Sequence, residues 1–285
     1  MTESIASVQF MTQDNTRIRA MQYSAVNAKA QILLAGATGV PQRFYQSYAK
    51  AANQAGFNVL TLDYRGIGQS KATSLKNFKM DYLDWAQQDL AAGLTKACEY
   101  GLPVYIVGHS YGGHAVGLLP NSHLIEGAYV FGTGAGWSGW MPPLERIKVN
   151  LMWKVIAPVI VKHHGYLAWS KLGMGEDLPI DVYRQWKRWC SYPHYFFDDP
   201  TMRHLHEQFA GFDKPLVAAN AIDDKWAQPA SRDAFFKAYK NAQVSRINLK
   251  PSQKNMKSID HMGYFKKQAG LIWQDTFAWI DAHLQ

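Results

Sequence analysis

Residues 108–113 read GHSYGG, which places Ser110 between glycines at the spacing of a nucleophile elbow. The apolar run 103–107 predicts a short buried strand before it, and the residues after it can continue as a helix. Such a turn would raise the serine oxygen at the carboxyl edge of a sheet. Gly108 and Gly112 would remove the Cβ atoms that collide where strand and helix crowd together. We therefore interpret Ser110 as a nucleophile rather than part of a loop of small residues.

A serine hydroxyl needs an adjacent base near neutral pH, and histidine is the usual one. The chain has 10 histidines, so position has to decide between them. His261 follows the last predicted strand and precedes the last predicted helix. Loops at the carboxyl ends of parallel strands are where ligand groups gather in such sheets. The sequence therefore predicts His261 as the base.

An orienting carboxylate should lie behind that histidine, and the stretch AIDDKWAQP offers two after the penultimate predicted strand. We prefer Asp224 to Asp223, because strand alternation points neighbouring side chains to opposite sides. The other aspartate would then be a turn cap or a charge at a helix N-terminus. Asp260 is a weaker candidate, since it is adjacent to His261 in the sequence.

The oxyanion of a tetrahedral intermediate needs backbone N–H donors. One donor is expected from Tyr111, directly after the nucleophile. The turn after the run QILLAG offers Ala37 and Thr38, and we expect Ala37 to be the second donor.

Predicted strands alternate with predicted helices along most of the chain, which indicates a mainly parallel sheet with helices on both faces. Alternation on both sides of residues 13–15 predicts an N-terminal antiparallel hairpin. The remaining predicted strands are 30–36, 57–63, 103–110, 125–134, 214–223 and 243–249, and the main predicted helices are 41–56, 80–100, 230–241 and 266–284.

This rhythm stops between about residues 134 and 212, where six of the ten tryptophans lie. We predict an α/β core in two parts, 1–133 and 213–285, with a helical insertion at 134–212 before the penultimate core strand. An aromatic insertion at this place is expected to act as a lid over an apolar substrate cleft.

Composition excludes several classes of function. The chain is 47% hydrophobic and only 18% charged, which argues against disorder. The formal net charge of +8 is not gathered in a block and accompanies no nucleic-acid motif, so we expect no nucleic-acid partner and a weak preference for anionic ones. The two cysteines lack metal-ligand spacing, so we expect no metal and a reduced, cytoplasmic protein.

Nothing in the sequence indicates export or a transmembrane segment. The N-terminus lacks a signal-peptide core, and the longest apolar run, near 149–161, is too short to span a bilayer. The sequence gives no indication of an organic cofactor or of the oligomeric state.

Together these motifs resemble the α/β-hydrolase superfamily over residues 25–133 and 213–285. LLAGATG resembles its oxyanion turn, DYRGIGQS its D-x-R-G-x-G-x-S loop, and DDKWAQP and HMGYF its acid and histidine segments. The chain is similar to uncharacterised bacterial hydrolases near the serine aminopeptidase and monoacylglycerol lipase branch. Ala35 stands where that family usually has a histidine before the oxyanion glycine.

The residues and the resemblance favour a serine hydrolase that cleaves a small or medium apolar carboxylic ester through an acyl-enzyme. Cleavage of an amide or peptide is the first alternative. An aminopeptidase-like cleft would need a carboxylate to anchor a free amine, for which Glu176, Asp177 and Asp181 are the candidates.

An NADP-dependent short-chain-type reductase is a weaker alternative. Tyr183 and Lys187 form a Y-x-x-x-K pattern, and Ser170 lies thirteen residues before Tyr183. However, Gln42 stands where the third glycine of a phosphate-binding turn belongs, and Pro41 removes an N–H donor. A non-catalytic binding protein on the hydrolase fold is the remaining alternative, and the complete predicted triad argues against it.

Overall fold

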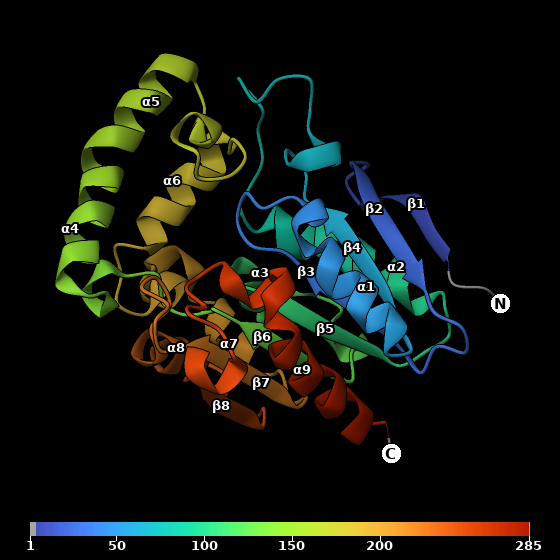
Figure 1. Ribbon diagram of the computed structural model, residues 1–285. Helices are drawn as coiled ribbons and strands as arrows, with labels where there is room; N and C mark the ends of the chain where they lie inside the picture. Colours follow the sequence, from blue (N-terminus) through green and yellow to red (C-terminus); the bar gives the residue numbers. More distant parts are fainter. Residues whose placement is uncertain (1–3, 285) are drawn as a thin grey trace.

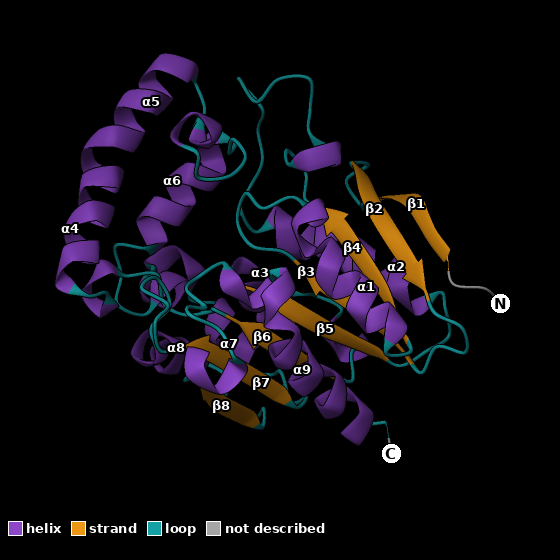
Figure 2. Ribbon diagram, viewed as in Figure 1, coloured by secondary structure: helices purple, strands orange, loops and turns teal. Residues whose placement is uncertain are grey.

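The computed structural model describes residues 4–284. Its strands are β1 Ser4–Met11, β2 Arg17–Ser24, β3 Ala30–Ala35, β4 Phe57–Asp63, β5 Val104–His109, β6 Gly127–Phe131, β7 Leu216–Ala221 and β8 Val244–Leu249. They form one sheet in the order β1-β2-β4-β3-β5-β6-β7-β8. Strands β3 to β8 are parallel, whereas β1 and β2 form an antiparallel hairpin that joins the sheet at β4 (Figure 2). The predicted fold class is confirmed.

The α-helices are α1 Gln46–Gln54, α2 Ala91–Cys98, α3 Tyr111–Leu118, α4 Pro143–Leu151, α5 Ala157–His164, α6 Ile180–Trp189, α7 Leu205–Ala210, α8 Pro229–Phe236 and α9 Gly270–Ala282. Alternation along β3 shows how they cover the sheet. Ile32 and Leu34 pack in one buried cluster with Phe277 of α9, and Leu33 packs in another with Leu94 of α2. Helices α1 and α9 therefore cover one face, and α2, α3 and α8 the other (Figure 1).

All four predicted helices are shorter than expected, since α8 ends at Phe236 and α9 begins at Gly270. The segment 41–56 begins with a 3₁₀ turn over Gln42–Tyr45 before α1. The segment 80–100 is helical only from residue 84, and its first regular part, Trp85–Leu90, is π-helical. The carboxylates of Asp81 and Asp84 accept local backbone N–H groups, so the chain before residue 84 forms a turn rather than a helix.

Helices α4 to α7 lie between β6 and β7, and we call residues 134–212 the insert. Helices α4 and α5 are joined by the π-helical segment Met152–Ile156 and form a long rod at the outer edge of the molecule, with α6 between the rod and the sheet (Figure 1). Over residues 4–284 no helix combines the length and the apolar character needed to cross a membrane.

The insert shares its apolar core with the sheet domain. Trp189, Phe196 and Phe209 of the insert belong to the same buried cluster as Leu33 and Ile106 of the sheet. The division of the chain into core and insert domains therefore stays a prediction, because no separate core marks it.

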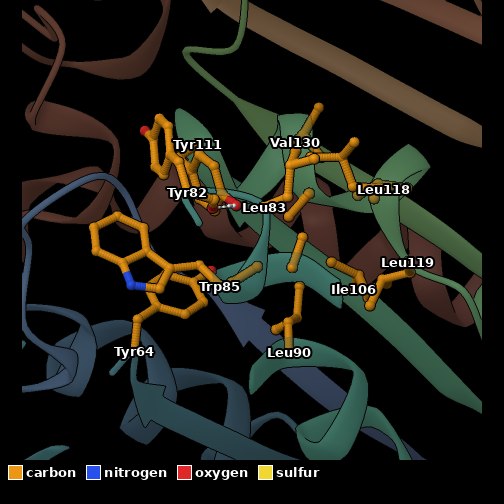
Figure 3. Close-up of a cluster of buried hydrophobic side chains, with 14 of the residues drawn as sticks. Tyr64, Tyr82, Leu83, Trp85, Leu90, Ile106, Tyr111, Leu118, Leu119 and Val130 are labelled. Atoms are coloured by element: carbon orange, nitrogen blue, oxygen red, sulfur yellow. Dashed lines mark hydrogen bonds between the residues drawn. The ribbon is translucent and has the colours of Figure 1, made fainter. Parts of the chain in front are cut away.

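An aromatic stack connects the insert to the turn after β5. Tyr82 is stacked between Tyr111, at a centroid distance of 4.6 Å, and Trp189 of α6, at 5.4 Å. Tyr64 and Trp85 extend the cluster beside these rings (Figure 3). The Tyr111 hydroxyl also donates to the backbone oxygen of Tyr82 at 2.9 Å. Helix α6 is thus packed, through one ring, against the residue that follows Ser110.

Buried Asp63, at the end of β4, holds two loops together. Its carboxylate accepts the Gln42 backbone N–H at 2.7 Å, the Gln42 side-chain amide at 2.9 Å and the Gln69 N–H at 2.9 Å. A Cβ on Gly68, which has φ of +49°, would overlap this carboxylate. The aspartate of the D-x-R-G-x-G-x-S motif therefore connects the segment after β3, at Gln42, to the segment after β4, at Gln69.

We predict that Asp63→Ala lowers the free energy of unfolding by about 3 kcal/mol, because three donors lose their acceptor and most are shielded from water. Urea unfolding measures this difference. Asp281→Ala is the matched control. Its ion pair with Lys29 is exposed, and its loss should cost less than about 1 kcal/mol. Equal effects of the two substitutions would contradict the role given to Asp63.

Candidate active site

Ser110 occupies the single residue between β5 and α3. Its backbone has φ of +53° and ψ of −108°, a conformation that L-residues rarely adopt. The Ser110 N–H donates to the Phe131 carbonyl at 2.8 Å, and the Thr133 hydroxyl donates to the Ser110 carbonyl at 2.9 Å. A Cβ on Gly112 would overlap the Ala35 carbonyl, so a glycine is needed where α3 crosses β3.

The structure brings together the three side chains that the sequence singled out. His261 Nε2 lies 3.0 Å from Ser110 Oγ, and His261 Nδ1 lies 2.9 and 3.1 Å from the two oxygens of Asp224. They come from three loops that follow β5, β7 and β8 at one edge of the sheet.

Asp224 is fully buried and its carboxylate has several donors. Oδ1 accepts the N–H groups of Trp226 and Ala227, each at 2.9 Å, and Oδ2 accepts the Tyr264 hydroxyl at 2.9 Å. Burial by itself would raise the pKa of Asp224, but His261 and these hydrogen bonds hold that pKa below its usual range. An ionised Asp224 accepts the Nδ1–H of His261, which leaves Nε2 free to accept the Ser110 proton.

The two other aspartates lie in different places. Asp223 accepts the Ile259 backbone N–H at 2.9 Å and so connects the β7 loop to the loop that carries His261. It was expected to be a turn cap or a helix-terminus charge, and it instead bridges two loops. Asp260, with φ of +50°, is exposed and lines a cavity.

Tyr111 and Ala37, the two predicted oxyanion donors, differ in the structure. Tyr111 is the first residue of α3, so its N–H has no partner inside the helix. The sequence predicts a free donor at Ala37. In the structure the Ala37 N–H instead donates to the Tyr45 hydroxyl at 2.7 Å. Tyr45 lies eight residues away, and no motif or periodicity in the sequence predicts that its hydroxyl returns to this turn. For the neighbouring Thr38 N–H, no acceptor is found within residues 4–284.

A buried hydrogen-bond chain connects this turn to the His261 loop. The Tyr45 hydroxyl lies 3.0 Å from His109 Nδ1, and His109 Nε2 lies 2.8 Å from the His261 carbonyl oxygen. Burial first, and the charge of His261 second, lower the pKa of His109 to about 3, so the ring is neutral. A carbonyl only accepts, so Nε2 carries the proton and Nδ1 accepts from Tyr45. Every bond in the chain then runs in one direction, from the Ala37 N–H to the His261 carbonyl.

Ser110 and His261 line two cavities. The first, of about 210 Å³, extends under the insert and is mostly apolar. Its apolar and aromatic lining consists of Met141, Val149, Met152, Trp153, Trp169, Met174, Trp186, Cys190, Tyr195 and Trp226. Burial raises the pKa of the Cys190 thiol, which therefore stays neutral in this lining.

The second cavity, of about 800 Å³, lies on the side of the Ala37 turn and has a charged rim that includes Arg43, Lys225 and Lys266. Glu145 lines both cavities and accepts the Trp226 indole N–H at 3.1 Å. Sequence reasoning missed Glu145, because it lies in no motif, and it assigned no role to Trp226, although that residue lies within DDKWAQP.

The three acids proposed as amine anchors all have other partners. Glu176 pairs with Arg43 at 3.1 Å and accepts the Gly68 N–H at 3.0 Å. Asp177 accepts from Ser170, and Asp181 lies 3.4 Å from Arg184. None of the three lines either cavity within the described part of the chain.

The chain matches a known family over most of its length. Residues 32–247 match a family model described as "Alpha/beta hydrolase family". The comparison with curated proteins found no match.

Many solved structures share the fold. The chain is similar to the esterase domain of a Rhodothermus marinus protein, with 18% identity over 99% of this chain and 100% of that one and a TM-score of 0.60. It is also similar to a soluble variant of monoglyceride lipase from Saccharomyces cerevisiae, with 15% identity, 99% and 96% coverage and a TM-score of 0.68. The chain is also similar to the acylaminoacyl peptidase of Pyrococcus horikoshii, with 12% identity over 99% of this chain and 41% of that one and a TM-score of 0.61.

We predict that His109 stays neutral as the Nε2–H tautomer from about pH 8 down to about pH 5, because its pKa lies near 3. Nitrogen-15 NMR of labelled histidines distinguishes the tautomers, and the His109→Gln variant assigns the resonance. Protonation of His109 with a midpoint above about pH 6, or an Nδ1–H tautomer, would contradict the direction of the hydrogen-bond chain.

Proposed function

Because the chain belongs to the alpha/beta hydrolase family, we propose that it is a serine hydrolase that cleaves a carboxylic ester through an acyl-enzyme. The observation that carries this proposal is the hydrogen-bonded series Ser110–His261–Asp224, with Ser110 Oγ at 3.0 Å from His261 Nε2. Ser110, the proposed nucleophile, lines an apolar cavity that can receive an acyl group.

In this mechanism, Ser110 Oγ attacks the ester carbonyl while His261 Nε2 takes the hydroxyl proton. The imidazolium then gives that proton to the leaving alkoxide, which departs as an alcohol. Water attacks the acyl-enzyme with His261 again as base, and the acid product and free Ser110 result. Asp224 stays ionised throughout and stabilises the imidazolium through its contact with Nδ1–H.

The oxyanion would lie between the N-terminus of α3 and the turn after β3. The Tyr111 N–H is the first donor. The second comes from the turn, where the Thr38 N–H is unoccupied and the Ala37 N–H would first have to leave Tyr45. We therefore propose Thr38 beside Ala37 as the second donor.

The lining of the smaller cavity supports an apolar acyl group of small to medium size. Four tryptophans and three methionines face it, and the insert supplies most of them. We propose that the insert, residues 134–212, is a lid between the core segments 1–133 and 213–285. The wider, charged cavity would then receive the alcohol part of the substrate.

An amide or peptide substrate remains the second candidate because of Glu145. This carboxylate lines both cavities next to Ser110 and could hold a free amine. Its contacts weaken that role, since it already accepts the Trp226 indole N–H and lies 3.9 Å from Lys148. Similar folds carry the names esterase, monoglyceride lipase and acylaminoacyl peptidase, so fold alone does not distinguish the two substrates. Membership of the alpha/beta hydrolase family argues against the short-chain-type reductase alternative.

We predict that Ser110→Ala folds normally and loses turnover by a factor of about 10⁴ to 10⁶, together with covalent labelling by a fluorophosphonate. The assay is a panel of p-nitrophenyl esters and aminoacyl amides, with each substrate also tested against Ser110→Ala. Short and medium alkyl esters should be cleaved best. Full esterase activity in Ser110→Ala would reject the mechanism. A preference for amides with a free amine that Glu145→Gln removes would replace the ester by an amide.

We further predict that Asp224→Asn lowers kcat by up to about 10⁴, because the asparagine would stabilise the wrong tautomer of His261. Asp223→Asn is the matched control. An asparagine oxygen can still accept the Ile259 N–H, so kcat should stay within a few-fold of the parent. Both variants are measured on one ester, with thermal melts to establish folding. The reverse order of effects would assign the acid to Asp223.

A further inference from the structure

The rod formed by α4 and α5 carries a row of exposed aliphatic side chains. Leu144, Ile147, Leu151, Val155 and Val159 are 75%, 65%, 50%, 53% and 65% exposed. Their spacing of three or four residues places them on one side of the rod. Among the described residues, the four most exposed large apolar side chains all belong to this row, which we call the outer stripe. Isolated exposed apolar residues are ordinary, but a continuous row of five is not.

The outer stripe does not serve the packing of the molecule. Packing is done by the other side of the same rod, where Val149, Met152 and Trp153 line the smaller cavity. Figure 1 shows α4 and α5 at the outer edge of the molecule, on the side away from β1 and β2. The rod is therefore apolar on two sides, one toward the cavity and one toward solvent.

The charges on the exposed side of the rod are all basic. The exposed ionisable residues of segment 143–164 are Arg146, Lys148, Lys154, Lys162 and His163. Glu145 is the one acidic residue in this segment, and it is largely buried against Trp226. A surface that meets this side of the rod should therefore combine apolar groups with negative charge.

We propose that the outer stripe binds a lipid bilayer with anionic headgroups. A convex apolar row flanked by lysines fits the boundary between headgroups and acyl chains, where lysine stems lie along the apolar layer and the ammonium groups contact phosphates. A second copy of the chain fits less well, because two outer stripes face to face would bring their lysines together, and each chain has a formal net charge of +8.

Binding in this way would place the insert at the lipid surface. The same helix supplies the wall of the cavity that contains Ser110, so the cavity would lie one helix thickness from the bilayer. This inference concerns the surface alone and does not depend on the reaction proposed for Ser110. The Ser110→Ala variant should bind lipid as the parent protein does, which separates a failure of this inference from a failure of the proposed function.

Co-sedimentation of the full chain with vesicles tests the inference. Vesicles of phosphatidylcholine and phosphatidylglycerol in equal parts are compared with vesicles of phosphatidylcholine alone. The parent protein should bind the anionic vesicles more tightly, and the double variant L151Q/V155Q should bind them at least about tenfold more weakly. The variant K154Q/K162Q should also lose affinity for anionic vesicles, and added salt should weaken the parent protein's binding.

Matched controls use exposed leucines outside the rod. Leu124 and Leu271 are 39% and 38% exposed, and L124Q/L271Q should bind as the parent does. All variants should retain the parent's circular dichroism and its turnover of a soluble ester, since none of these side chains lines either of the two cavities at Ser110. The inference is overturned if the parent protein does not bind anionic vesicles, or if L151Q/V155Q binds them equally well. A dimer that L151Q/V155Q dissociates, without vesicle binding, would assign the stripe to self-association instead.

Discussion

The backbone at Ser110 is the constraint on which the site depends. A residue with φ of +53° is strained, and it persists only where its surroundings hold it. Here the Ser110 N–H is donated to β6, its carbonyl accepts from Thr133, and α3 lies so close to β3 that position 112 has no room for a side chain. Contacts at the sheet edge therefore fix the backbone of Ser110 without help from Asp224 or His261. Tyr111 follows in the same turn as the first residue of α3, so its N–H has no partner inside the helix.

Buried polar side chains then place the neighbouring loops relative to that turn. Asp63 holds the chain after the β3 turn, His109 joins that region to the His261 loop, and Asp223 joins the His261 loop to the β7 loop. Each of these side chains bonds to backbone groups, so the loops are fixed by directional contacts and not only by apolar packing. At Asp224, His261 first and the other hydrogen-bond donors second hold the pKa of the buried carboxylate below its usual range, so that it is ionised behind His261.

Much of this arrangement could be predicted from the sequence because it depends on local rules. Runs of apolar residues predict the parallel strands, alternation predicts the N-terminal hairpin, and the glycines around Ser110 predict the turn. The placement of His261 and Asp224 after the last two strands follows from the common edge of a parallel sheet. Tyr45 could not be predicted, since its hydroxyl reaches Ala37 through the packing of a 3₁₀ turn that sequence periodicity does not describe. Glu145 was missed for a similar reason, because only the folded insert brings it beside Ser110.

The insert joins two different physical requirements in one structure. Through Tyr82, α6 is stacked against Tyr111, so the inner side of the insert packs against the residue that follows Ser110. The outer side, formed by α4 and α5, exposes apolar side chains to solvent. Exposure of apolar surface to water is unfavourable in free energy, and no packing within the described part of the molecule offsets it. A contact at the outer side would therefore involve a layer of helices that also packs against the site. An apolar substrate that moves from such a contact to Ser110 would have to cross only this layer. The thickness and packing of the insert would therefore affect access to the site as well as the stability of the protein.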